Sequence, residues 1–234
     1  KLSVRQQVCL IHCGEAVEQW KVLHERLRRV KYLADSQITS DLLSGASAVL
    51  VDEAHLLSQE KLEYLLRYCG NRPVIFSSDY ENMLSPEELD RAAVHALEQI
   101  SGIQSFRLTN RIRTNAEISS FIQNMMCLPE RKKGRHFPHV TVLYANDDRE
   151  ADVLLSDAQH QGYQEILNEA EPAICAGRLA MVLDQRYFYD RQNYLRSEDR
   201  SVRRLFHQLN GAKEELLLVV KQNEPLYAVL LDLL

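Results

Sequence analysis

The sequence predicts an α/β protein whose strands form parallel sheets. Two observations predict this class: short runs that are apolar throughout, and helical patterns that alternate with them. Continuous apolar runs are typical of strands covered on both faces, as in parallel sheets. Strands that alternate with helices favour the same class. The expected strands are VCLI (8–11), AVLVD (48–52), VIFSS (74–78), VTVLYA (140–145), LAMVLD (179–184) and ELLLVV (215–220).

Helical patterns lie between these runs, and several begin at residues that favour a helix start. The segment 85–100 has the clearest start: Ser85 is the expected N-cap, Pro86 occupies the first helical position and Glu88 the capping-box position. The other segments keep their apolar residues on one side or open with a capping residue. The expected helices are EAVEQWKVLHERLRRV (15–30), SQEKLEYLLRYC (58–69), SPEELDRAAVHALEQI (85–100) and TNAEISSFIQNMM (114–126).

The segment CLPERKKGRHFPH (127–139) predicts a boundary between two units. It combines two prolines, a glycine and a basic cluster with little apolar material. We expect a first α/β unit over residues 1–128, a basic linker over 129–136 and a second unit over 137–234.

Composition predicts an ordinary globular protein in a reducing compartment. The chain has 234 residues, of which 45% are hydrophobic and 26% are charged. It contains no apolar run of the ~20 residues that span a bilayer. Five scattered cysteines do not suggest a disulfide framework. We therefore expect no membrane partner and a cytoplasmic location, or a nuclear one in a eukaryote. A net charge of -5 argues against a protein coated in nucleic acid, although it leaves room for a local basic groove.

The stretch VLVDEAHLL (49–57) places Asp52, Glu53 and His55 directly behind a buried strand. Acids at the carboxyl end of a strand sit where open α/β sheets bind ligands. A magnesium–nucleotide site needs one carboxylate on the metal side and a group that positions water. Asp52 and Glu53 point to opposite sides of an extended chain, so they can divide these roles. The alternative is a strand that ends in a solvated acid pair.

Six stretches of the chain, in order, resemble the motifs of one family. VLVDEAH is similar to its Walker B motif, VIFSSDYENMLSPEE to the next motif, and FRLTNRIRTNAEISSFI to the arginine motif, the most specific match. VTVLYANDDREADVLLSDAQHQGYQEI resembles the opening of the second lobe, and LAMVLDQRYFYD and LFHQLNGAKEELLLVV resemble its last two strands. The family is the superfamily-1-helicase-like P-loop ATPases of bacteria and phages, whose relatives include the helicase-like region of schlafen proteins.

The resemblance implies two RecA-like parallel-sheet lobes, each a three-layer αβα sandwich, with the first lobe lacking its P-loop strand. It implies that Asp52 holds Mg²⁺ through water, that Glu53 orients the attacking water and that His55 is a coupling residue.

It also implies nucleotide contacts from Arg113, Asp79 and Asn82. Arg113 would contact phosphate, which a planar guanidinium suits, and Asp79 would be the acid of the coupling motif. From the residues alone, an Arg113 salt bridge at a helix start and an Asp79 turn are the ordinary interpretations.

The chain also departs from the family pattern. No G-x-x-x-x-G-K-[ST] phosphate loop occurs, so we expect the chain to begin after that motif and to bind ATP and Mg²⁺ if an upstream P-loop completes the site. The coupling motif usually has Gln where this chain has Asn82, and EPAICAGR replaces a stretch that helps to bind nucleotide and nucleic acid. Gly211 stands at the family's finger arginine. Lys213, roughly opposite on a helix, is a poor substitute.

Three further groups of residues have weaker functional interpretations. Cys9, His12 and Cys13 are zinc-ligand types, but no second pair lies at suitable spacing. Aromatic residues interleave with arginines over 186–196, a pattern of base stacking or of ordinary packing. A basic cluster suits either a nucleic-acid phosphate backbone or a solvated linker. It comprises Arg131, Lys132, Lys133 and Arg135.

Two functions remain open on the sequence. The first is a helicase-like P-loop NTPase core, incomplete or impaired for hydrolysis in this chain, that translocates on or remodels single- or double-stranded nucleic acid. The second is a degenerate, inactive helicase-like module that binds a partner protein or nucleic acid. A missing phosphate loop by itself would fit a truncated chain. The additional loss of the finger arginine and of the nucleic-acid-binding stretch favours the second function, the inactive module.

Overall fold

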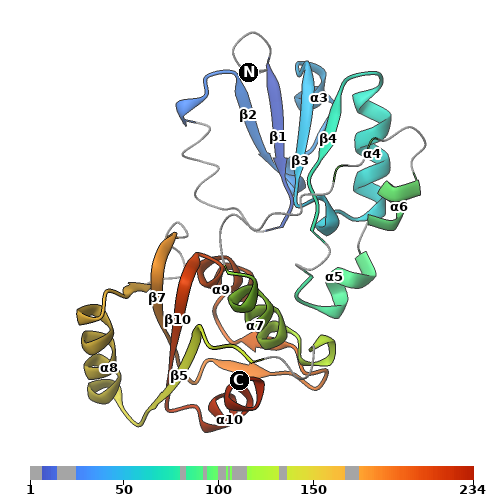
Figure 1. Ribbon diagram of the computed structural model, residues 1–234. Coiled ribbons are helices and arrows are strands. Elements are labelled where there is room, and N and C mark those ends of the chain that lie inside the picture. Colours follow the sequence, from blue (N-terminus) through green and yellow to red (C-terminus); the bar gives the residue numbers. More distant parts are fainter. Residues whose placement is uncertain are drawn as a thin grey trace. The chain divides into compact units, whose positions relative to one another are not determined.

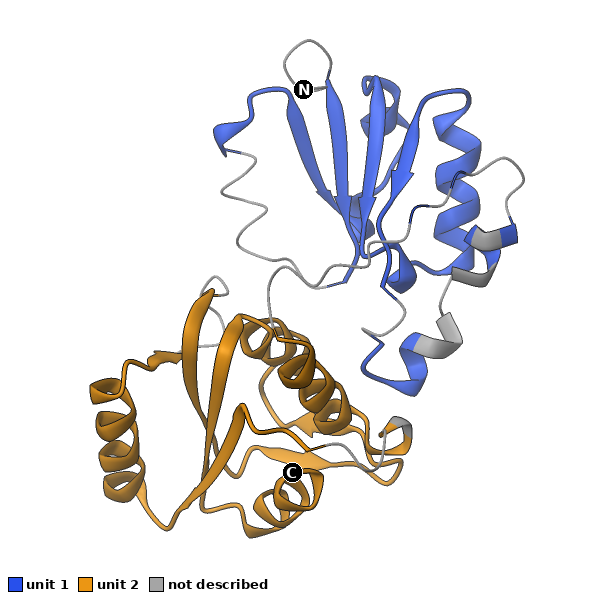
Figure 2. Cartoon of the chain, viewed as in Figure 1, with its two compact units in different colours: residues 1–106 blue, residues 107–234 orange. Residues whose placement is uncertain are grey.

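The expected apolar runs form strands in two parallel sheets. The computed structural model describes residues 7–14, 25–79, 83–91, 94–99, 104, 106, 115–131, 136–166 and 174–234. The chain divides into two compact units, residues 1–106 and 107–234 (Figure 2). Each unit holds one four-stranded sheet with parallel pairing (Figure 1), which confirms the predicted α/β class. Within the described residues, no helix has the length and apolar character needed to cross a membrane.

The sheet of the first unit has the order β2-β1-β3-β4. Its strands are β1 (Val8–His12), β2 (Val30–Ala34), β3 (Ala48–Asp52) and β4 (Val74–Phe76). His12 lies opposite Asp52 in the β1–β3 pair, and Val51 lies opposite Phe76 in the β3–β4 pair. The carboxyl ends of these three strands therefore meet at one edge of the sheet.

One face of this sheet packs against α3 (Ser40–Ser44), α4 (Gln59–Cys69) and α6 (Val94–Gln99). Because side chains alternate along a strand, every second residue of β1 and β3 enters this core. Each fully buried leucine contributes roughly 1.5–3 kcal/mol relative to exposure. The core includes Cys9, Ile11, Val49, Val51, Leu43, Leu62, Leu65 and Leu97.

Two of the helix starts that the sequence predicts in this unit are present. Ser58 caps α4, because its Oγ accepts a hydrogen bond from the backbone N–H of Lys61 at 3.3 Å. Ser85 accepts one from the backbone N–H of Glu88 at 3.2 Å. Within the segment predicted as a helix over 85–100, α5 (Pro86–Arg91) and α6 are helical, and residues 92–93 and 100 lie outside the described part of the chain.

The prediction of a helix over 15–30 is wrong at its end. Val30 begins the strand β2, which pairs with β1, and residues 15–24 lie outside the described part of the chain. The sequence VKYLA that forms β2 carries a lysine and a half-buried tyrosine, so it lacks the continuous apolar run of an interior strand. Its position at the sheet edge is consistent with that composition, because edge strands commonly carry charged residues such as lysine.

The sheet of the second unit has the order β5-β10-β7-β6 and helices on both faces (Figure 1). On one face, α8 (Asp148–His160) packs through Ala151 and Leu155 against Ala180 and Leu217 of the sheet. On the other face lie α7 (Ala116–Met126), α9 (Val202–Leu209) and α10 (Glu224–Leu233). The strands are β5 (Val140–Ala145), β6 (Gln164–Ile166), β7 (Ala176–Leu183) and β10 (Ala212–Lys221).

Helix α7 belongs to the second unit, so the division at 106/107 differs from the boundary expected at 129–136. The helix is capped by Asn115, as its sequence predicts, and contacts α9, α10 and β10. Phe121 of α7 lies edge-on to Phe137, with ring centroids 5.5 Å apart. The proline-rich and basic composition of 127–139 therefore marks a connection within this unit, including the short helix η4 (Leu128–Glu130).

A β-hairpin of β8 (Tyr187–Tyr189) and β9 (Leu195–Ser197) completes the second unit. The sequence does not predict these two strands, because aromatic and basic residues are interspersed there and no continuous apolar run is present. Asp190 fixes the turn: its Oδ1 accepts hydrogen bonds from the backbone N–H groups of Gln192 and Tyr194 at 2.9 and 3.0 Å.

Gly211 joins α9 to β10 at a point where the backbone of another segment passes close by. A Cβ atom at this position would lie 1.9 Å from the carbonyl oxygen of Ile174. The Gly211 carbonyl also accepts a hydrogen bond from the backbone N–H of Ala176 at 3.2 Å. Lys213 lies on the strand β10, so the expected helical relation between positions 211 and 213 is wrong.

We predict that Gly211→Ala lowers the free energy of unfolding by about 1–3 kcal/mol, because the backbone near Ile174 must move. Chemical unfolding followed by circular dichroism measures this change. Gly45→Ala is the matched control, since its Cβ would meet only a Gln7 side-chain oxygen at 4.0 Å and Gly45 has helical dihedral angles. A Gly211→Ala protein as stable as this control would contradict the close approach.

Candidate functional site

Polar residues gather where β1, β3 and β4 end. His12 ends β1, Asp52 ends β3, and Ser77 and Asp79 follow β4. Backbone hydrogen bonds extend the sheet past these ends. The Ser77 N–H donates to Val51 at 2.8 Å, and the Ser77 carbonyl accepts from Ala54 at 2.8 Å. The chain on either side of Ser77 is thus held against the end of β3.

Both carboxylate oxygens of Asp52 have partners on neighbouring strands. His12 Nδ1 lies 3.2 Å from Oδ2, and Ser77 Oγ donates to Oδ1 at 2.5 Å. Burial would raise the pKa of Asp52, but the hydrogen bonds from His12 and Ser77 and the charge of His12 outweigh burial, so the pKa lies below its ordinary value. Asp52 is therefore an ionised carboxylate at neutral pH, and its side chain remains 27% exposed.

Two neighbouring groups, Cys13 and Tyr32, have pKa values raised mainly by burial and further by the carboxylates at this edge of the sheet. Burial, followed by the charges of Asp35, Asp52 and Glu53, raises the pKa of the Cys13 thiol. Burial and Asp52 likewise raise the pKa of Tyr32 on β2. The raised pKa favours the protonated thiol at neutral pH, and Cys13 lies in the buried core.

Glu53 has a left-handed backbone, with φ of 52° and ψ of 42°. The expectation that Asp52 and Glu53 alternate along an extended chain is therefore wrong, since the strand ends at Asp52 and the chain turns into the short helix η2 (Ala54–Leu56). This conformation is costly for a residue with a Cβ, and such outliers gather at functional sites. The turn is closed by the backbone N–H of Leu56, which donates to the Glu53 carbonyl at 2.9 Å.

His55 connects η2 to the segment after β4. Its side chain is 1% exposed, and its Nδ1 accepts a hydrogen bond from the backbone N–H of Asp79 at 3.2 Å. A ring nitrogen that accepts must lack a proton, so Nε2 carries the hydrogen in the neutral ring. His55 thereby fixes the backbone at Asp79.

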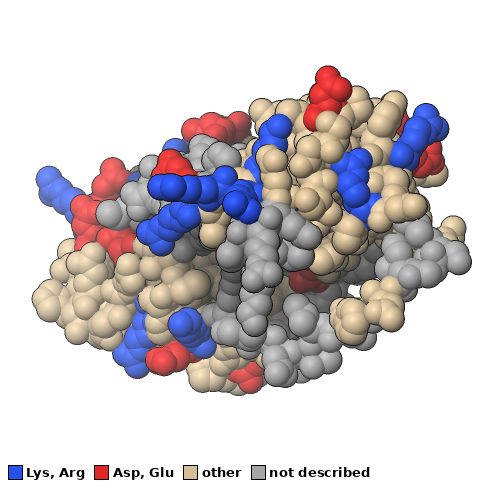
Figure 3. Space-filling model, turned by 90° about the horizontal axis from the view of Figure 1, so that it is seen from above, with Lys and Arg blue, Asp and Glu red and all other residues tan. Residues whose placement is uncertain are grey.

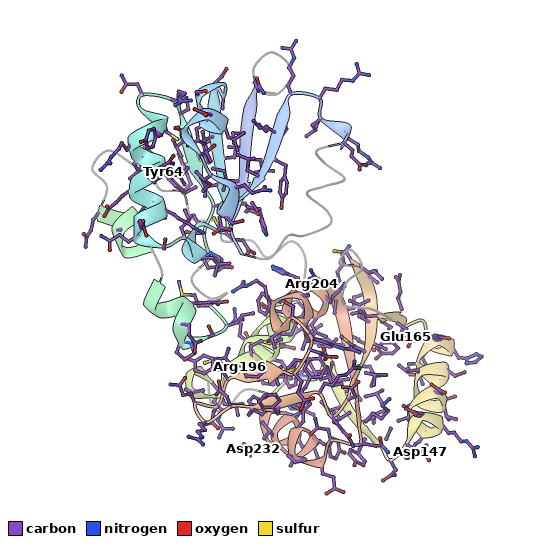
Figure 4. The ribbon with its side chains drawn as sticks, turned by 180° about the vertical axis from the view of Figure 1, so that it is seen from behind. Tyr64, Asp147, Glu165, Arg196, Arg204 and Asp232 are labelled. Atoms are coloured by element: carbon purple, nitrogen blue, oxygen red, sulfur yellow. The ribbon has the colours of Figure 1, made fainter. Side chains whose placement is uncertain are left out.

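Several of the residues expected in a site lie outside the described part of the chain. They are Asn82, Arg113, Lys132, Lys133 and Arg135. Of the expected basic cluster, Arg131 is described, and its Nη1 pairs with Oδ2 of Asp232 on α10 at 2.6 Å (Figure 4 labels Asp232). On the face seen in Figure 3, Lys and Arg are interspersed with Asp and Glu.

The residues considered for zinc are not brought together. Cys9 and Cys13 enter the core beside the helices, whereas His12 points to the other face and contacts Asp52. Among the described residues, no three His, Cys, Asp or Glu side chains are grouped to hold a metal.

The surroundings of Asp52 suit Mg²⁺ bound through water better than Mg²⁺ bound directly to the carboxylate. Mg²⁺ keeps several waters and uses one or two carboxylates together with phosphates. Because both oxygens of Asp52 already accept hydrogen bonds, binding through water preserves these contacts, whereas direct ligation displaces one of them.

The aromatic and basic residues of 186–196 are mostly used in packing. Tyr187 and Tyr194 are buried, and the Tyr189 hydroxyl donates to the Met125 carbonyl at 2.8 Å. Arg196, labelled in Figure 4, pairs with Asp190 at 2.7 Å. These contacts favour the packing interpretation over base stacking.

Sequence reasoning missed the roles of His12 and Ser77. A local signal existed for His12, since VCLIH ends in a polar residue just as AVLVD does. Its partner lies 40 residues away, however, and only the register of β1 against β3 joins them.

No family model matches the sequence, and no curated protein matches it. The resemblance to helicase-like ATPases therefore depends on the motifs quoted above.

We predict that Glu53→Gly raises the free energy of unfolding by roughly 0.5–1 kcal/mol, because glycine adopts a left-handed backbone without steric cost. Glu63→Gly, at an exposed position within α4, is the control and should lower it by about 1 kcal/mol. Urea unfolding measures both changes. Equal destabilisation by the two substitutions would show that the Glu53 backbone carries no strain.

Proposed function

We propose that the chain is the core of a helicase-like P-loop NTPase, built from two RecA-like lobes, in which the first unit supplies the acid side of the nucleotide site. One observation carries the proposal: Asp52, Glu53, His55 and Asp79 gather at the carboxyl edge of a parallel sheet, where such folds bind nucleotides. The quoted motif resemblance supplies the chemical class.

In this proposal, Asp52 would hold Mg²⁺ through its water shell, and Glu53 would orient the water that attacks the terminal phosphate. The ionised state of Asp52 suits a cation, and its exposure leaves room for water. His55 links Glu53's turn to the segment of Asp79, so movement at one strand end is transmitted to the next. The proposal retains Arg113 and Asn82 as nucleotide contacts on the strength of the motif resemblance.

The proposal requires a phosphate-binding loop from outside these 234 residues, because the sequence contains no G-x-x-x-x-G-K-[ST]. Loop glycines and a lysine hold the β- and γ-phosphates through backbone N–H groups and charge. ATP and Mg²⁺ would then bind between that loop and the acids of the first unit.

We predict that Glu53→Gln in the natural full-length protein lowers the kcat for magnesium-dependent ATP hydrolysis by about 10²-fold or more, with nucleotide binding retained. Glu60→Gln, exposed in the first turn of α4, is the matched control and should be unchanged. A phosphate-release assay and a fluorescent ATP analogue measure hydrolysis and binding separately.

Residues 1–234 alone should show no turnover in the same assay. Turnover by this chain that Glu53→Gln abolishes would contradict the need for an external loop. Equal kcat in Glu53→Gln and wild type would contradict the role of Glu53.

A second candidate is a non-hydrolysing, helicase-like binding module, and one observation favours it. The position of the family's finger arginine is occupied by Gly211, where a side chain meets the Ile174 carbonyl. An arginine finger contributes ~10³–10⁵ in rate in comparable enzymes. Without one at this position, the inherited acids can persist in a module that holds a protein or nucleic acid.

For nucleic-acid binding by this module, we predict an affinity for a labelled single strand that falls as salt rises. A plot of the logarithm of the binding constant against the logarithm of the salt concentration should have a slope of about −0.7 for each phosphate contact. Replacing Lys132 and Lys133 by alanine should lower affinity and flatten the slope, whereas Lys213→Ala, exposed on β10, is the control. Fluorescence anisotropy measures these values, and binding without salt dependence would contradict the interpretation.

A further inference from the structure

His12 is a buried polar residue at the end of an apolar strand. Its side chain is 2% exposed, and its Nδ1 is 3.2 Å from Asp52 Oδ2. Burial of a histidine costs free energy unless its polar atoms are bonded. An apolar residue would fill the end of β1 without that cost, so packing alone does not account for a histidine here.

The chemistry of Asp52 fixes the direction of this hydrogen bond. An ionised carboxylate only accepts hydrogen bonds, so His12 Nδ1 carries the proton and donates it. Ser77 donates to the other oxygen. One donor comes from the end of β1 and the other from the chain after β4, and together they fix the rotation of the carboxylate between them.

A fixed carboxylate matters most when it contacts an ion through water. In that geometry the carboxylate orders a hydration shell, and rotation of the group displaces every water it contacts. Outer residues that orient a metal-side group typically change metal affinity by about 10–100-fold when removed.

We propose that His12 is a positioning residue for Asp52, which it holds, opposite Ser77, in the orientation that receives the water shell of a magnesium–nucleotide complex. The inference rests on the proposed function and adds to it a residue from β1, a strand that none of the matched acid motifs includes.

The test uses the natural full-length protein and a fluorescent, non-hydrolysable ATP analogue, titrated with Mg²⁺. His12→Leu removes the donor at similar size, and His12→Gln keeps an N–H donor. We expect His12→Leu to raise the Mg²⁺ concentration at half-maximal binding by about tenfold, and His12→Gln to recover part of this. Affinity for the analogue without Mg²⁺ should not change.

Two further variants separate positioning from folding. Ser77→Ala removes the second donor from an exposed residue and should shift the Mg²⁺ dependence in the same direction, even where His12→Leu fails to fold. Cys9→Ala is the control for loosening of β1, because Cys9 faces the helix-covered core. It should lower stability and leave the Mg²⁺ dependence unchanged.

A spectroscopic readout tests the pair without nucleotide. Nitrogen-15 NMR of the histidine rings should show a protonated Nδ1 for His12 in the wild type, and this signal should shift in Asp52→Ala. An unprotonated Nδ1, or an unchanged signal in Asp52→Ala, would overturn the inference.

The outcomes distinguish this inference from the function on which it rests. Magnesium-dependent binding in the wild type with unchanged dependence in His12→Leu and Ser77→Ala would overturn the positioning role alone. Absence of magnesium-dependent binding in the wild type would overturn the proposed nucleotide site, and the positioning role with it.

Discussion

The candidate site depends on the register of β1 against β3. This pairing places His12 opposite Asp52, and the pairing of β3 with β4 brings Ser77 to the same point. Because side chains alternate, a slip of one residue would turn Asp52 into the helix-covered core and separate it from His12. The apolar residues Cys9, Ile11, Val49 and Val51 prevent this slip, since they fill that core only in the observed register. The packing of the apolar core thus fixes the strand register that places His12 opposite Asp52.

The polar edge of the first sheet costs folding free energy, and the hydrophobic core of the same unit contributes in the opposite direction. A left-handed Glu53 costs about 1–3 kcal/mol, and burial of His12 and His55 adds the desolvation of two imidazoles. Four fully buried leucines around the sheet each contribute roughly 1.5–3 kcal/mol; they are Leu43, Leu57, Leu62 and Leu65. The strained, charged edge of the first unit thus lies beside a core of fully buried leucines, which contribute to the stability of the same unit. Such a distribution of cost and gain is expected where strain serves binding rather than stability.

Much of this fold follows from local sequence, and the candidate site follows from it only in part. Continuous apolar runs were sufficient to predict β1, β3, β4, β5, β7 and β10, all of which belong to the two parallel sheets. They failed for β2 and β6, two edge strands of mixed composition, and for the β8–β9 hairpin, whose Tyr189 hydroxyl donates to the Met125 carbonyl of α7. The position of Asp52 and Glu53 at the end of β3 made them candidates, and the motif resemblance supplied their proposed roles and that of His55. The left-handed turn at Glu53 and the His12 contact depend on strand pairing, which no local pattern encodes.

The packing at Gly211 has an evolutionary consequence. The carbonyl of Ile174 occupies the space of a Cβ, so any side chain at 211 requires prior movement of the segment that enters β7. A single substitution therefore cannot install an arginine here without disturbing the second sheet. At least one permissive change near Ile174 has to come first. The backbone of the second unit thus limits which residue position 211 can hold, whatever a ligand at that position would require.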